Sequence, residues 1–184
     1  AVQAAERFAA RLAELQAAGL GSKDAFVLLQ SYSTGCVTHL LRANFEEGDW
    51  TRRLDEVFLQ TLERLVSSTL NADQRAQAFL RLADGGLGFG SAAATVSAAY
   101  LASWALTLKE VAGSLGVSSW ESSQTRGEPV AASIRRAENH LQESSAREIE
   151  GPNWVGCLDE SLGKLQGVWS RRLRARGRQK LLQR

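Results

Sequence analysis

Apolar side chains recur along this chain at helical spacing, and this pattern constrains the fold more than any other feature of the sequence. Between residues 50 and 66, Leu54, Phe58 and Leu62 share one broad apolar face, as on an amphipathic helix. The charged side chains of this segment, including Asp55 and Glu56, are expected largely off that face. The usual signs of strands, period-two alternation and an Asn-Gly or Asp-Gly turn between β-branched runs, are missing. We therefore predict an all-α fold, a multi-helix bundle that ends in a basic C-terminal helix.

Composition along the chain indicates how the bundle is divided. A length of 184 residues is enough for one sizeable core. The segment 118–128, SSWESSQTRGE, is polar and rich in serine, as expected of a linker. We predict a helical bundle over residues 1–117, a polar linker over 118–128, and a two-helix C-terminal segment with a basic tail over 129–184. Because the sequence contains no methionine, we also expect it to be an internal piece of a longer protein.

The stretch GGLGFG, residues 85–90, holds four glycines and precedes a run without charge, 91–108. Residues 88–93 fit the G-x-G-x-x-A pattern of dinucleotide-binding loops, but that loop needs a strand before the turn. Here the preceding residues have helical spacing. A membrane span is also disfavoured, because residues 91–108 are mostly Ala, Ser and Thr, which transfer weakly into lipid.

A sharp corner between two packed helices accounts for this stretch better. Glycine permits positive φ and close backbone approach, and Ser91 is placed to cap the helix that comes next. Leu87 and Phe89 are expected to anchor the corner in the core. The glycines that build the corner are Gly85, Gly86, Gly88 and Gly90.

The two cysteines, Cys36 and Cys157, lie far apart, and the sequence has no C-x-x-C motif. Neither a disulfide framework nor a zinc site is indicated, which suggests a reducing compartment. The N-terminal segment has the pattern of a charged amphipathic helix and not that of a hydrophobic signal. We therefore expect an intracellular protein, nuclear or cytoplasmic and not secreted. Of the two histidines, His39 is expected to pack between helices and His140 to be exposed.

Positive charge is concentrated at the C-terminal end. Residues 171–184, RRLRARGRQKLLQR, hold seven of the 22 Lys and Arg residues and no acid, although the formal net charge of the chain is only +2. Such a tail points to a polyanionic partner, either nucleic acid or an acidic protein or lipid surface. At helical spacing, one face of the tail carries Arg171, Arg174 and Arg178, and another carries Arg172, Arg176 and Lys180.

Five segments, taken in order, resemble the region directly downstream of the polymerase palm in reverse transcriptases of non-LTR retrotransposons. That region is the α-helical thumb with its C-terminal extension, and the resemblance covers residues 1–110. The matching segments are AFVLLQS (25–31), THLLR (38–42), LDEVF (54–58), GGLGF (85–89) and AAYLASW (98–104). The chain departs from the family at residues 44–47, where NFEE replaces the usual prolines.

The resemblance implies a non-catalytic C-terminal part of an RNA-directed DNA polymerase. Such a thumb grips the template–primer nucleic acid, an RNA or RNA–DNA duplex, beside an upstream palm domain of the same chain, through phosphates more than bases. The Tyr/Phe-x-Asp-Asp motif of the palm is absent, so we expect no catalytic residue, metal site or cofactor in this segment, although the parent polymerase would need Mg²⁺. Besides the basic tail, candidate phosphate contacts are Arg42, Arg52, Arg53, Arg75 and Arg81.

A second hypothesis is a standalone helical scaffold or adaptor whose basic tail binds an acidic protein partner. The Ala-rich helix expected over residues 91–112 would give it a face for docking another helix. The two hypotheses differ in one observable, because only the first predicts affinity for nucleic acid at moderate salt. Neither includes a membrane partner.

Overall fold

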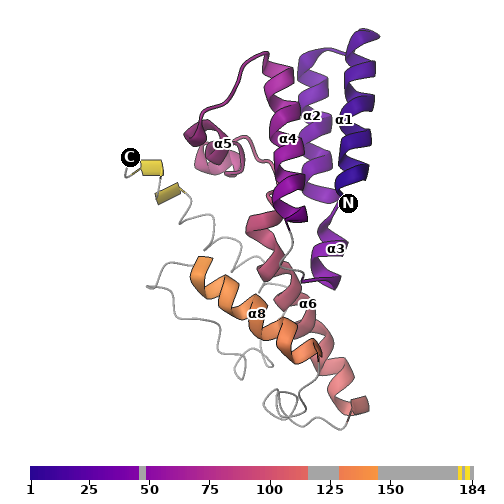
Figure 1. Ribbon diagram of the computed structural model, residues 1–184, viewed down its shortest axis with the longest axis vertical. Helices are drawn as coiled ribbons and strands as arrows, with labels where there is room; N and C mark the ends of the chain where they lie inside the picture. The colour runs from indigo at the N-terminus through magenta and orange to yellow at the C-terminus, as the bar shows by residue number, and fades with distance from the viewer. Residues whose placement is uncertain (46–48, 116–128, 145–177, 180, 183–184) are drawn as a thin grey trace. The chain divides into compact units, whose positions relative to one another are not determined.

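The computed structural model describes residues 1–45, 49–115, 129–144, 178–179 and 181–182 (Figure 1). All regular structure in these ranges is helical, and no strand occurs among them, so the predicted all-α fold is confirmed. The predicted linker, 118–128, lies outside the described residues and stays a prediction. The helices are α1 (Val2–Ala17), α2 (Ser22–Gly35), α3 (Thr38–Ala43), α4 (Trp50–Val66), α5 (Ala72–Ala78), the short 3-10 helix η1 (Leu82–Asp84), α6 (Ala92–Leu115) and α8 (Pro129–Ser144).

Contacts between backbones divide the chain into two compact units. The first unit comprises residues 1–38, 47–93 and 177–184, and the second comprises residues 39–46 and 94–176. The first unit therefore holds α1, α2, α4, α5, η1 and the first two residues of α6. The second holds most of α3, the rest of α6, and α8.

Three helices, α1, α2 and α4, pack side by side in the first unit (Figure 1). The face of α4 predicted from its spacing is buried, with Leu54, Phe58 and Leu62 fully inside. Aromatic rings join the three helices: Phe8 of α1 stacks on Tyr32 of α2 with ring centroids 3.9 Å apart, and Tyr32 meets Phe58 edge-on at 6.2 Å. These contacts make a continuous core, since offset and edge-on ring pairs are favourable in addition to the apolar area that they bury.

A capping box begins α5. The Asn71 side chain accepts a hydrogen bond from the Gln74 backbone N–H at 2.9 Å, and the Gln74 side chain accepts one from the Asn71 N–H at 2.9 Å. Two N–H groups that have no partner inside the helix are thereby satisfied. The preceding helix, α4, ends where Ser67 adopts a left-handed conformation with φ of 50°. This pair of ends sets the turn between α4 and α5.

In the second unit, α8 packs against α6. The Ser97 hydroxyl and His140 Nδ1 are 2.6 Å apart, and the Tyr100 and Ser133 hydroxyls are also 2.6 Å apart. The buried face of α8 consists of Ile134, Ala137 and Leu141. Small side chains on α6, among them Ala98 and Ala102, are buried as well, as close helix packing requires.

The predictions for the two histidines were wrong. His39 is exposed, whereas His140 is half-buried and bonded to Ser97. The ring of Phe45 also lies against His140, with centroids 6.0 Å apart. His140 comes three residues after Ala137, which places it at the edge of the buried face of α8.

Candidate nucleic-acid interface and its support

The glycine corner joins η1 to α6, and each of its four glycines has a steric reason. Gly85 and Gly88 have φ of 80° and 75°, a region that residues with a Cβ rarely adopt. Gly86 lies against the backbone of Leu80, where a Cβ would collide with the carbonyl group. A Cβ on Gly90 would lie 2.8 Å from the Ser33 carbonyl oxygen. The backbone of this corner therefore requires glycine at these four positions of the sequence GGLGFG.

Hydrogen bonds attach the corner to α2. The Gln30 side-chain amide donates to the Leu87 carbonyl at 2.6 Å, and the Gly90 N–H donates to the Ser33 hydroxyl at 3.3 Å. Phe89 is buried and meets Phe26 edge-on at 5.5 Å. Phe89 is thus an anchor, as predicted, whereas the same prediction for Leu87 was wrong, because its side chain is 37% exposed.

Asp55 of α4 holds the start of α6. Its carboxylate accepts hydrogen bonds from the Ser91 hydroxyl at 2.6 Å, the Ala92 N–H at 2.7 Å and the Ala93 N–H at 3.3 Å. The first N–H groups of a helix have no partner within it, so a residue from another helix satisfies them here. Asp55 is only 8% exposed. The expectation that Asp55, like the other charged residues of this segment, lies off the apolar face of α4 was therefore wrong.

The charge of Asp55 is affected by two opposed influences. Burial raises the pKa of Asp55 to about 6, while the hydrogen bonds from Ser91, Ala92 and Ala93 act in the lowering direction but less strongly. Near neutral pH the group is mostly ionised, and its negative charge faces the positive end of the α6 dipole. As the pH falls below about 6, an increasing share of the folded molecules carries a proton on this side chain.

Arg75 of α5 is engaged by two carboxylates of α4. Its guanidinium lies 2.9 Å from a Glu56 oxygen and 3.0 Å from a Glu63 oxygen. Hydrogen bonds with Glu56 and then Glu63 raise the pKa of Arg75. The Glu63 carboxylate also accepts a hydrogen bond from the Leu70 N–H at 3.0 Å, which is the largest cause of its lowered pKa. Arg75 thus links α5 to α4. The sequence had indicated it only as a candidate phosphate contact.

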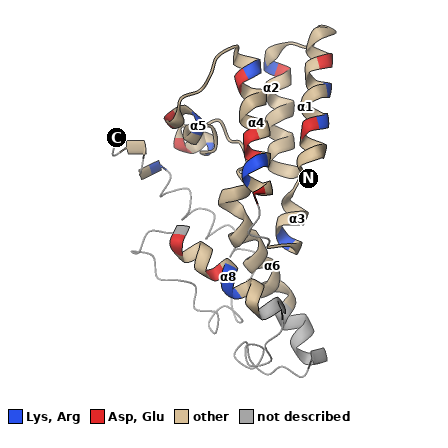
Figure 2. Cartoon of the chain, viewed as in Figure 1, with Lys and Arg blue, Asp and Glu red and all other residues tan. Residues whose placement is uncertain are grey.

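Arg52 and Arg53 lie in the first turn of α4, and both side chains are exposed. Figure 2 shows the basic segment at this end of the helix. Among the ion pairs of the described residues, none involves Arg52 or Arg53. A cation at the N-terminal end of a helix gains nothing from the helix dipole, because that end is itself positive. The two arginines therefore place two exposed cations in the first turn of α4, close to the exposed Asp49 that precedes the helix.

The other predicted cations are in different situations. Arg81 is exposed in the first unit and Arg42 is exposed in the second. Arg178 is exposed as well and lies 3.7 Å from the Asp84 carboxylate in η1. The remaining tail cations lie outside the described residues and stay predictions: Arg171, Arg172, Arg174, Arg176 and Lys180.

The described residues were also compared with the requirements of a metal site and of a membrane-spanning helix. Among the described residues, no three His, Cys, Asp or Glu side chains lie close enough together to hold a metal ion. Cys36 is half-buried, and this burial raises the pKa of its thiol. In that part of the chain, too, the helices are each too short or too polar to cross a lipid bilayer.

Comparisons of the chain with known protein families, curated proteins and solved structures found no match. The function must therefore be inferred from the chain's own residues and contacts. One contact links two of the segments on which the resemblance rests to the start of α6. Asp55, within the LDEVF segment, accepts hydrogen bonds from residues 91–93, which lie just beyond the GGLGF segment. The LDEVF segment thus supplies the acceptor for the start of α6, the helix that follows the glycine corner.

Proposed function

We propose that this chain is a nucleic-acid-gripping helical module, the non-catalytic C-terminal part of a retrotransposon-type reverse transcriptase, within the cell nucleus or cytoplasm. It holds the template–primer duplex, RNA or RNA–DNA, while an upstream palm domain performs the Mg²⁺-dependent chemistry. The observation that supports this most is the pair of exposed arginines, Arg52 and Arg53, at the positive end of α4. Duplex phosphates are the anions that such a charged helix end suits.

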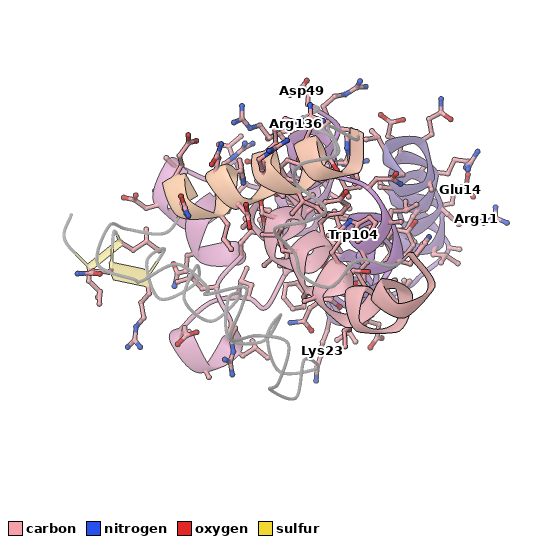
Figure 3. All side chains as sticks on the ribbon, turned by 90° about the horizontal axis from the view of Figure 1, so that it is seen from below. Arg11, Glu14, Lys23, Asp49, Trp104 and Arg136 are labelled. Carbon is pink, nitrogen blue, oxygen red and sulfur yellow. The ribbon has the colours of Figure 1, made fainter. Side chains whose placement is uncertain are left out.

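The contrast with the paired arginines favours this location. Arg75 is held by two carboxylates, and Arg11 lies 2.8 Å from Glu14 on α1 (Figure 3). A paired arginine exchanges one anion for another when it binds a phosphate, so it gains somewhat less than an unpaired arginine, although exposed pairs are individually weak. Neither Arg52 nor Arg53 forms such an ion pair among the described residues, although the exposed Asp49 lies about one turn before them. We therefore assign the first phosphate contacts to the start of α4.

The support beneath these arginines is rigid. Asp55 comes three residues after Arg52 in α4 and is fixed by its three hydrogen bonds to the start of α6. Leu54, the next residue after Arg53, is fully buried. Side chains carried by a fixed backbone lose less conformational freedom on binding than those on a mobile loop. A rigid helix end with long, mobile cations suits contacts that are not specific for sequence.

The assignment can be tested with a fluorescently labelled RNA–DNA hybrid of about 20 base pairs and two matched double variants. Arg52→Gln with Arg53→Gln removes two charges from the start of α4, and we expect affinity to fall roughly tenfold and the salt slope to decrease by about 1.8. The control is Lys23→Gln with Arg64→Gln, which removes two exposed charges from the start of α2 and the end of α4. We expect the control to weaken binding by less than about twofold.

Two results would overturn the assignment. Equal weakening by both double variants would show that only total charge matters. No binding by the unmodified chain would favour the standalone adaptor with an acidic protein partner. The contribution of the tail is tested separately by deleting residues 171–184, which we expect to weaken binding further. If this deletion leaves affinity unchanged, the tail is not part of the interface.

A further inference from the structure

We propose that Asp84 acts as an internal competitor of nucleic acid for the basic C-terminal segment, and this proposal rests on the proposed function. Asp84 is the last residue of η1, directly before the glycine corner. Its carboxylate lies 3.7 Å from the guanidinium of Arg178, and both residues belong to the first compact unit. In this arrangement a carboxylate takes the place beside Arg178 that a phosphate would otherwise occupy.

The corner holds Asp84 in position. The Asp84 N–H donates to the Arg81 carbonyl at 2.9 Å, and the Gly86 N–H donates to the same carbonyl at 2.9 Å. The Gln77 side chain also donates to the Gly85 carbonyl at 2.8 Å. Asp84 is therefore presented by a turn whose backbone is bonded on both sides of it. A fixed carboxylate binds a cation with little loss of its own freedom.

Residues 178–179 and 181–182 are helical, and Leu181 is half-buried while Leu182 is exposed. Leu181 comes three residues after Arg178, so the two side chains share a face. One face thus combines an ion pair with apolar burial. This combination gives the segment a defined resting place on the chain itself.

The strength of the contact fits a competitor that can be displaced. The Arg178 and Asp84 side chains are 54% and 28% exposed, and ion pairs at this exposure contribute little. A duplex offers many phosphates and releases counterions when it binds cations. We therefore expect nucleic acid to displace Asp84 readily. The effect of Asp84 is then to lower the affinity moderately and to discourage weak or short nucleic acids.

A double-mutant cycle on the full chain tests the competition. With the same hybrid, Asp84→Asn should tighten binding roughly two- to fivefold in the otherwise unmodified chain. In the Arg178→Gln background the same substitution should have no effect, because the cation that Asp84 competes for is gone. Asp24→Asn, at an exposed acid in the first turn of α2, controls for the general effect of removing one negative charge. Equal gains in both backgrounds, or equal gains from Asp84→Asn and Asp24→Asn, would overturn the proposal.

A cross-linking experiment separates failure of this proposal from failure of the proposed function. In a Cys36→Ser, Cys157→Ser background, D84C and R178C should be joined by a short bismaleimide, whose spacer replaces the length of the arginine side chain, and the hybrid should slow this cross-linking. Cross-linking with no effect of Asp84→Asn on a measurable affinity would refute the competition alone. No nucleic-acid binding by any variant would refute the proposed function and the competition together. No cross-link at all would show that residue 178 does not come close to residue 84 in solution, and would refute the competition.

Discussion

Asp55 and Glu56 are neighbours in α4, yet they hold later parts of the chain in different ways. Asp55 is buried and accepts three hydrogen bonds from the start of α6. Glu56 is partly exposed and pairs with Arg75 of α5 at 2.9 Å. One attachment uses a desolvated carboxylate and backbone N–H groups, whereas the other uses two mobile side chains in contact with water.

Solvent exposure, more than charge, therefore decides how much each attachment contributes. Removing a buried acceptor leaves donors without a partner and costs the full desolvation penalty. Removing one member of an exposed ion pair allows water to replace it, so the loss is small. We expect the corner to behave as part of the core and the α4–α5 contact to behave as a surface feature. Stability measurements on matched variants test this contrast.

The largest effect is expected for Asp55→Ala. This substitution leaves the Ala92 and Ala93 N–H groups without their acceptor, and we expect the free energy of unfolding to fall by about 3 kcal/mol. Denaturant titration monitored by circular dichroism measures the change. Glu56→Ala is the matched control on the neighbouring residue and should cost less than about 1 kcal/mol. Equal losses for the two variants would contradict the contrast.

A second prediction concerns the close backbone contact at Gly90. The Cβ introduced by Gly90→Ala would lie 2.8 Å from the Ser33 carbonyl oxygen and 3.0 Å from Thr34 Cα. Such overpacking should cost about 2 kcal/mol of unfolding free energy. Gly35→Ala is the control, because a Cβ there meets nothing within 4 Å and should be neutral or slightly stabilising. If both glycines tolerate alanine, the corner is not tightly packed against α2.

The third prediction uses the titration of Asp55. The pKa is raised from 3.8 to about 6 in the folded chain, so the folded state binds this proton more tightly than the unfolded state. The corresponding stabilisation is present at low pH and is lost as the pH rises through 6. Lowering the pH from about 7 to about 5 should therefore add about 1 kcal/mol to the unfolding free energy of the unmodified chain. The Asp55→Asn variant should not show this gain, because it has no carboxyl group at this position. Parallel pH profiles for the two proteins would refute this.

The smallest effect is expected for Arg75→Gln. The Arg75 side chain is 32% exposed, and its partners Glu56 and Glu63 are 43% and 16% exposed, so the loss of these partly solvated pairs should cost about 0.5 to 1 kcal/mol. Raising the salt concentration should reduce the difference further, because the pairs are open to screening. Thermal unfolding at low and high salt measures it. A loss as large as that of Asp55→Ala, insensitive to salt, would show that the two attachments do not differ.

Local sequence rules predicted the features that depend on local spacing. The apolar face of α4 and the all-helical fold arise from residues within a few positions of one another. The glycine stretch belongs to this group, since positive φ at Gly85 and Gly88 is a property of those residues alone.

Features that depend on distant partners were not predictable in this way. Asp55 contacts an N–H group 37 positions away, and His140 meets Ser97 at a separation of 43. Spacing within one helix says which side chains share a face, but not which polar group is later covered by another helix. The only local indication that Asp55 would be buried was its place between apolar residues in the segment LDEVF. The positions of Glu56 and Glu63 in α4 likewise did not indicate that Arg75 of α5 would pair with both of them.

The most direct test of the account is the salt dependence of binding between the unmodified chain and the RNA–DNA hybrid. If about five cations contact phosphates of this duplex, the logarithm of the association constant should fall against the logarithm of salt concentration with a slope of roughly −4.5. A second hybrid of unrelated sequence should give the same line, because phosphates carry no sequence information. Absence of binding at about 50 mM salt, where such contacts are strong, would contradict the account.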